Sequence, residues 1–194
     1  MENPVEQVFE EVKHAILSQL RAKIAQLDNN SPEIEEILDK LSKEFSIQAP
    51  MLICSETQVT IGQESVSAQE ISNGSPRGQI VYFALYTVPM EGDYALFVQL
   101  LKRYTQGSNF HHHAGKVFFK EPSPVEIIGN KRVISKIKSR AAARISEIDN
   151  LLTQFYEKAN KFNNETLVAI INIEQEKENI KKHTEEVLNP YLEV

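Results

Sequence analysis

Apolar residues in the first part of the chain follow a helical spacing. They recur every three or four positions from about Pro4 to Leu27, which places them along one side of a helix. A second stripe begins after Ser31-Pro32 and runs to about Phe45; serine is a favoured helix cap and proline suits the first helical turn. Because both helices are amphipathic, we predict that they pack together as a helical hairpin.

The pattern changes to short apolar runs after Pro50. These runs are rich in β-branched and aromatic residues and lie at 51–54, 59–61, 79–88, 117–119, 125–128 and 132–137. The run at 79–88 follows a loop signal at 72–78 and is apolar at nearly every position, which is typical of a strand covered on both faces. Gly129-Asn130 predicts a tight hairpin turn between the last two runs. This region therefore predicts a small, mostly antiparallel sheet of about five or six strands.

From Ser139 onward the spacing is helical again. Its most regular part has the alternating steps of three and four that are typical of a coiled-coil seam, at Ile145, Ile148, Leu152, Phe155, Ala159 and Phe162. Asn163-Asn164 is predicted to separate this helix from a second one that stops at Asn189-Pro190. The seam can pack within the fold or between subunits. We predict the second use, association through this seam, which makes the protein a homo-oligomer.

Taken together, the elements predict an α+β fold. It consists of an N-terminal helical hairpin, a small mostly antiparallel sheet and a C-terminal antiparallel helical hairpin with coiled-coil character. We expect two domains, with the first hairpin and the sheet over residues 1–138 and the C-terminal hairpin over residues 139–194. The length of 194 residues fits such an arrangement.

Composition narrows the class of protein. The chain is 41% hydrophobic and 25% charged, as in an ordinary globular protein. The single cysteine, Cys54, excludes an internal disulfide framework and a multi-cysteine zinc site, and it suits a reducing compartment. No run approaches the roughly 18 apolar residues of a membrane span, and the first residues do not have the pattern of a signal peptide. We therefore expect a cytoplasmic protein that does not contact a membrane.

Charge is unevenly distributed along the chain. The net charge is −6, which argues against a protein whose whole surface binds nucleic acid, but residues 102–144 contain ten basic and two acidic residues. The densest part, which we call the basic block, consists of Lys131, Arg132, Lys136, Lys138, Arg140 and Arg144. We predict that the basic block binds a partner. Nucleic acid is an alternative ligand, and a solvated face without a ligand is the structural alternative.

The predicted secondary structure arranges these cations in pairs. Arg140 and Arg144 are expected to share a helical face, and Lys136 and Lys138 a strand face. Charge reversal at Lys136, Arg140 and Arg144 is expected to weaken partner binding without loss of folding.

Two groups of residues were considered for metal or catalytic chemistry. In the triplet His111-His112-His113 only the outer two share one side of a strand, and no further ligands stand at a suitable spacing, so we predict no metal and no cofactor. Glu91, Asp93 and Lys116 have the residue types of a small metal-dependent nuclease, which stays an alternative function. The structural alternative is that Asp93 caps the segment that follows it.

Two motifs and the order of the elements carry a resemblance. The motifs are Pro89-Met90-Glu91-Gly92-Asp93-Tyr94-Ala95-Leu96-Phe97 and Phe162-Asn163-Asn164-Glu165-Thr166-Leu167. Over roughly residues 30–188 the chain resembles an uncharacterised bacterial helper or sensor module of prokaryotic defence proteins. In longer chains such modules are joined to TIR-like or nuclease effectors. The resemblance implies a non-enzymatic regulatory or recruiting subunit whose effector is a separate polypeptide.

Overall fold

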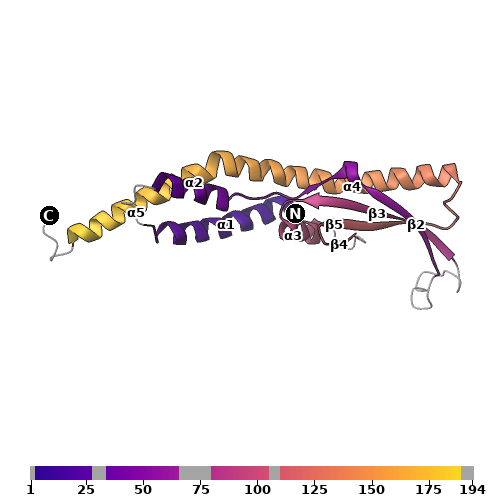
Figure 1. Ribbon diagram of the computed structural model, residues 1–194, viewed down its shortest axis with the longest axis horizontal. Helices are drawn as coiled ribbons and strands as arrows, with labels where there is room; N and C mark the ends of the chain where they lie inside the picture. Colours follow the sequence, from indigo (N-terminus) through magenta and orange to yellow (C-terminus); the bar gives the residue numbers. More distant parts are fainter. Residues whose placement is uncertain (1–2, 28–33, 66–79, 105–109, 189–194) are drawn as a thin grey trace. The chain divides into compact units, whose positions relative to one another are not determined.

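The computed structural model describes residues 3–27, 34–65, 80–104 and 110–188 (Figure 1). They form helices and a small antiparallel sheet, which confirms the predicted α+β class. The chain divides into two compact units, one made of residues 1–49 and 154–194 and the other of residues 50–153. This division differs from the predicted domains 1–138 and 139–194. The reason is that the N-terminal helices pack with the C-terminal helix instead of joining the sheet.

The first unit is helical. α1 (Pro4–Ile24) begins at Asn3, whose side chain accepts a hydrogen bond from the backbone N–H of Val5 at 3.0 Å. α1 and α2 (Ile34–Glu44) both contact α5 (Val168–Leu188), and Lys23 of α1 forms an ion pair with Glu44 of α2. The two N-terminal helices are thus linked to each other and both lie on α5. The predicted start of the second helix at Ser31-Pro32 lies outside the described residues.

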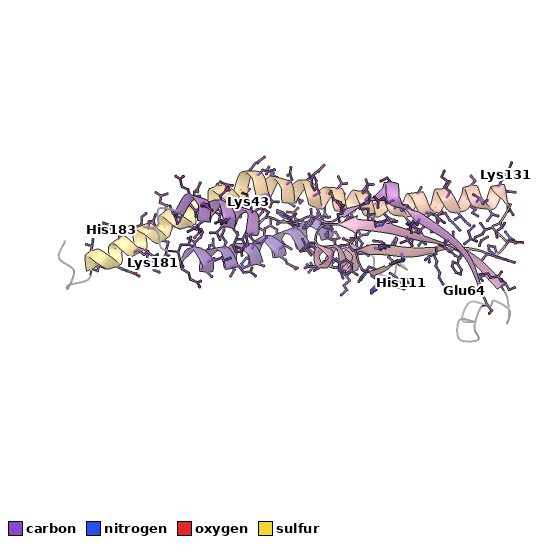
Figure 2. All side chains as sticks on the ribbon, in the orientation of Figure 1. Lys43, Glu64, His111, Lys131, Lys181 and His183 are labelled. Atoms are coloured by element: carbon purple, nitrogen blue, oxygen red, sulfur yellow. The ribbon has the colours of Figure 1, made fainter. Side chains whose placement is uncertain are left out.

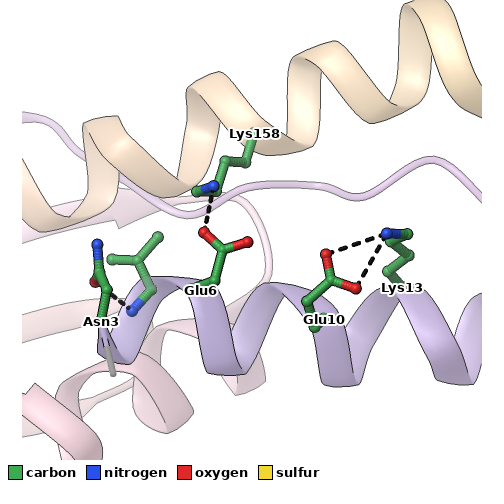
Figure 3. A network of polar contacts seen from close by, with 6 residues as sticks. Asn3, Glu6, Glu10, Lys13 and Lys158 are labelled. Carbon is green, nitrogen blue, oxygen red and sulfur yellow. Dashed lines mark hydrogen bonds and ion pairs between the residues drawn. The ribbon is translucent and has the colours of Figure 1, made fainter. Parts of the chain in front are cut away.

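Ion pairs accompany an aromatic contact in this unit, and Figure 3 shows the pairs Glu6–Lys158 and Glu10–Lys13. The ring of Phe9 meets the rings of Phe155 and Phe162 edge-on, with centroids 6.2 Å apart in each pair. Lys158 pairs with Glu6, and its Nζ lies 5.8 Å from the centroid of Phe9. These contacts hold α1 against residues 154–167.

Residues 131–188 are continuously helical. α4 (Lys131–Lys161) passes into a π-helical turn (Phe162–Leu167) and then into α5. Asn163 stabilises this turn, because its side-chain amide accepts a hydrogen bond from the N–H of Ile47 at 2.9 Å and donates one to the carbonyl of Ile47 at 3.0 Å. The chain therefore stays helical where the sequence predicted a turn. The predicted stop at Asn189-Pro190 lies outside the described residues.

The second unit contains the sheet. Its strands are β1 (Met51–Leu52), β2 (Gln58–Ser65), β3 (Ile80–Glu91), β4 (Phe110–His113) and β5 (Lys116–Ser123), and every described pairing is antiparallel. β3 is central. It pairs with β1 and β2 on one edge and with β5 on the other, and β4 lies outside β5. A short 3-10 helix (Cys54–Glu56) connects β1 to β2, and α3 (Tyr94–Tyr104) follows β3.

One face of the sheet forms the core of this unit. Ala84, Tyr86 and Val88 of β3 pack with Ile137 and Ala141 of α4. On the opposite face, residues 81, 83, 85 and 87 are only half-buried, so the two faces are not equally covered as the apolar run suggested. The ring of Phe83 lies across Gly62 on that face, since a Cβ at Gly62 would come within 2.4 Å of it.

Several predicted strands and loops have a different structure. Residues 125–128 form a loop and residues 132–137 belong to α4, so the predicted hairpin at Gly129-Asn130 is wrong. Gly129 does have a positive φ of 74°, but Asn130 caps α4 by accepting a hydrogen bond from the N–H of Val133 at 3.2 Å. α3 was not predicted, and the triplet 111–113 lies in β4.

Candidate functional site

The basic block occupies the first half of α4, so its cations follow helical spacing (Figure 2 labels Lys131 at the start of this helix). The buried Ile137 and Ala141 face the sheet. Arg132, Lys136, Arg140 and Arg144 are spaced by four and lie along one flank of α4, whereas Lys131 and Lys138 lie along the other. Lys136 and Lys138, which were predicted to share a strand face, are therefore on different sides of a helix.

Arg140 and Arg144 neutralise a buried carboxylate. Glu121 of β5 is 2% exposed, and its two carboxylate oxygens lie 3.0 Å from Nε of Arg140 and 2.8 Å from Nε of Arg144. The Arg144 contact is an ion pair without hydrogen-bond geometry. Arg140 also donates a hydrogen bond to the carbonyl of Pro122 at 2.7 Å. These two arginines hold α4 against β5, which is a structural role.

Aromatic side chains line the same contact. The guanidinium of Arg144 lies 6.0 Å from the ring centroid of Phe119, and Tyr86 stacks on Phe119 at 5.1 Å. Burial, followed by the negative charge of Glu121, raises the pKa of Tyr86 above its ordinary value of 10.0. The phenol is therefore neutral at physiological pH and serves as a packing group.

Arg132, Lys136 and Arg140 of this flank also border a groove, which we call the α4 groove. It has a volume of about 270 Å³ and lies between α4 and the segment after β5. Its lining includes the apolar residues Pro124, Val125 and Val133, which we call the apolar floor, and the cations Arg132, Lys136 and Arg140, which we call the cationic wall. Ser123 shapes the floor by donating a hydrogen bond to the carbonyl of Val125 at 2.7 Å. The groove thus places positive charge beside apolar surface.

Four cations of the block have no acidic partner among the described residues. Lys131, Arg132, Lys136 and Lys138 are all exposed, and the block's ion pairs in the described chain are those of Arg140 and Arg144. The first turn of α4 contains no acidic residue, although the positive end of a helix favours acids. The start of α4 is consequently a region of unneutralised positive charge, as the sequence predicted.

The predicted association seam lies inside the chain. Ile145 is half-buried, and the other five residues are at most 2% exposed: Ile148, Leu152, Phe155, Ala159 and Phe162. Phe155 and Phe162 contact Phe9, and Ile145 packs against the core of the sheet. Of the two alternatives, packing within the fold accounts for these residues. The five buried residues have almost no surface to offer a second copy, so their burial does not support association through this seam. That the protein forms a homo-oligomer stays a prediction.

The residues considered for a nuclease have other roles in the structure. Asp93 caps α3, because its carboxylate accepts hydrogen bonds from the N–H groups of Ala95 at 2.8 Å and Leu96 at 3.2 Å. Glu91 ends β3 opposite Met51, and Lys116 begins β5 opposite Pro89. Within the described ranges, no group of three or more His, Cys, Asp or Glu side chains is placed to hold a metal ion.

The histidines and the cysteine do not converge either. His112 forms a hydrogen bond with the hydroxyl of Tyr94, whereas His111 and His113 are exposed on the other face of β4. Partial burial, then the charge of Asp149, raises the pKa of the Cys54 thiol above 9.0. This direction is opposite to the shift that activates a cysteine nucleophile.

The two motifs that carry the resemblance are explained by the fold. In the first, Gly92 has a positive φ of 84°, Asp93 caps α3, and Leu96 and Phe97 are buried. In the second, Phe162 and Leu167 are buried on either side of the asparagine that binds Ile47. Both motifs therefore have structural roles.

Sequence reasoning missed Glu121 and the α4 groove. The signal for Glu121 was present, because it is one of only two acidic residues among residues 102–144. The groove had no comparable signal, since most of its floor and wall residues lie at 125–128 and 132–137, which were predicted to be strands.

Among the described residues, no helix is both long enough and apolar enough to cross a membrane. Comparison with protein-family models, with curated proteins and with solved structures finds no match to this chain.

Proposed function

We propose that this chain is a non-enzymatic interaction module, a regulatory or recruiting subunit that binds an acidic segment of a separate partner protein in the α4 groove. The observation that carries the proposal is the position of Arg132 and Lys136. Both cations are exposed, unpaired within the described chain, and adjacent to an apolar floor. Such a site attracts carboxylates by charge and binds a neighbouring apolar side chain by burial.

The apolar floor favours a protein ligand over nucleic acid. A peptide segment offers aliphatic or aromatic side chains to Pro124, Val125 and Val133, whereas a phosphate backbone has no such group to bury. The rest of the chain is acidic, with 25 acids outside residues 102–144 against 11 basic residues there, and it repels a long polyanion that extends beyond the groove. We therefore propose a protein ligand, and the test below includes an oligonucleotide to check the nucleic-acid alternative.

The resemblance to defence-associated modules adds an expectation about the partner. If it holds, the acidic segment belongs to an effector encoded as a separate polypeptide, and the present chain recruits or regulates it. This assignment stays a prediction, as does the cytoplasmic location expected from composition.

The proposal can be tested with a fluorescently labelled peptide of eight residues that combines aspartate and glutamate with phenylalanine and leucine. We expect Arg132→Glu with Lys136→Glu to weaken its binding at least about tenfold in fluorescence anisotropy, because two attractive charges become repulsive. The affinity for the unchanged protein should fall as salt is raised.

The matched control reverses two exposed lysines elsewhere, Lys102→Glu with Lys161→Glu, which gives the same change in net charge. We expect this control to bind within about twofold of the unchanged protein, since long-range charge effects are screened. Equal binding by the groove variant and the unchanged protein would contradict the proposal. Tighter binding of an RNA or DNA oligonucleotide of the same charge would favour the nucleic-acid alternative.

A further inference from the structure

β2 forms an open edge of the sheet. Its eight residues pair with β3 from Gln58 opposite Thr87 to Ser65 opposite Ile80, and no other described segment pairs with it. Every residue of β2 except Gly62 is exposed. Natural proteins protect edge strands by making them short, or with proline, lysine or bulges. β2 is long, contains no proline, and carries one charge, that of Glu64, which is paired with Lys120 at 2.6 Å.

The exposed apolar side chains of β2 lie on the same side of the sheet as α4. Val59 is opposite Tyr86 and Ile61 is opposite Ala84, and both partners belong to the core that α4 covers. Yet Val59 is 52% exposed and Ile61 is 47% exposed. The cover provided by α4 over β3 therefore does not extend to the edge strand.

The ion pairs of Arg140 and Arg144 show which flank of α4 lies toward β2. Arg140 and Arg144 contact Glu121 of β5, and β5 lies on the side of β3 opposite to β2. The other flank of α4 carries Ile134, which is 43% exposed, together with Lys131 and Lys138. An apolar surface with cations beside it thus accompanies the outer edge of β2, which has no partner strand among the described residues.

We infer that the edge of β2 binds an extended segment of another protein as an additional antiparallel strand. Backbone hydrogen bonds to β2 provide affinity, and alternate side chains provide specificity. The ligand class is a strand with apolar residues on the α4 side, to cover Val59, Ile61 and Ile134, and with carboxylates that reach Lys131 or Lys138. This surface lies on the opposite flank of α4 from the α4 groove, so the inference does not depend on the proposed function.

The positive charge beside β2 indicates that the added strand comes from a different protein and not from a second copy of this chain. Pairing β2 with β2 of another copy would bring two flanks carrying Lys131 and Lys138 toward each other. No acidic residue stands on this flank between positions 131 and 145 to neutralise them. An acidic strand removes the repulsion, whereas a second copy adds to it.

The probe for the test is a labelled eight-residue peptide in which valine alternates with threonine and glutamate stands at both ends. We expect it to bind the full chain in fluorescence anisotropy and to slow hydrogen exchange of the amides in residues 58–65. The same peptide with N-methyl groups on alternate residues cannot donate the ladder hydrogen bonds, and we expect it not to bind.

Ile61→Lys places a charge on the edge and should weaken peptide binding at least about tenfold. The matched control is Ile128→Lys, an equal change at a residue that is 71% exposed in the loop before α4, and it should bind like the unchanged protein. Val59→Lys repeats the test at a second position of β2, with circular dichroism to verify that each variant is folded.

The inference is overturned if the peptide does not bind at millimolar concentration, if Ile61→Lys and Ile128→Lys bind it equally, or if exchange slows outside residues 58–65 only. A peptide-free dimer that Ile61→Lys dissociates in sedimentation experiments would show a second copy as the occupant. That result would overturn the assignment to another protein.

Discussion

Single residues divide the basic block into two chemical roles. Arg140 and Arg144 are the counter-ions of Glu121, a carboxylate that is almost completely buried. Lys131 and Lys138, on the same helix, have no acidic partner among the described residues. A charge that neutralises a buried partner contributes to stability, whereas an exposed charge is free to act on a ligand.

Charge reversal should separate these roles. Arg140→Glu with Arg144→Glu should lower the free energy of unfolding by about 3 kcal/mol, because Glu121 is left buried without a counter-ion. This loss is at the low end of what breaking a buried ion pair costs, since both arginines are partly exposed to water. The sequence alone predicted intact folding for such changes, and the buried carboxylate revises that expectation.

Lys131→Glu with Lys138→Glu is the control on the same helix. It should change the free energy of unfolding by no more than about 0.5 kcal/mol in urea denaturation. Equal losses for both double variants would show that Glu121 does not depend on its arginines.

At the scale of elements, the π-helical turn joins α4 to α5 without a break in the helix. Its asparagine, Asn163, acts toward Ile47 as a neighbouring strand would, with one donated and one accepted hydrogen bond. The side chain of the adjacent Asn164 is exposed and donates a hydrogen bond to the side chain of Asn160 at 2.8 Å. Asn163 therefore links the turn to a residue distant in sequence, whereas Asn164 makes a local contact within the helix.

Asn163→Ala should lower the free energy of unfolding by about 1–2 kcal/mol, because both polar groups of Ile47 lose their partner. Asn164→Ala should be neutral or slightly stabilising, since alanine has the higher helix propensity and little is lost. Thermal unfolding of the two variants gives the comparison. If Asn164→Ala lowered the free energy of unfolding more than Asn163→Ala does, the hydrogen bonds to Ile47 would not be what stabilises the turn.

For the whole molecule, the division into two compact units is the main result. Phe9, Phe155 and Phe162 form the aromatic contact of the helical unit, and Phe119 belongs to the core of the sheet unit. Buried aromatic residues dominate core energetics, so each unit has its own sensitive position.

Phe9→Ala should destabilise the helical unit by about 3–5 kcal/mol and speed hydrogen exchange in α1, α5 and residues 154–161. Exchange in β3 and β5 should change little. Phe119→Ala should give the reverse pattern. Faster exchange throughout the chain for both variants would instead show a single cooperative unit.

Local patterns in the sequence determined much of this protein. Helical spacing identified α1, α2 and the seam that runs along α4 to Phe162, and the dense apolar run identified β3, the central strand. Charge counting found the basic block and the absence of nearby acids at the start of α4. These features are local because side-chain periodicity and charge are properties of neighbouring residues.

Only the tertiary structure decided what each surface faces. The short β-branched runs at 125–128 and 132–137 fit a strand or a helix equally, and the packing of Val133 and Ile137 on the sheet selected the helix for the second run. The spacing of the seam predicted an interface between subunits, whereas in the structure Phe9 and the core of the sheet pack against its residues. The ion pairs of Glu121 with Arg140 and Arg144 form because β5 and α4, which are separate in sequence, pack together. Periodicity marks which side of an element is apolar, but long-range contacts determine which partner buries it.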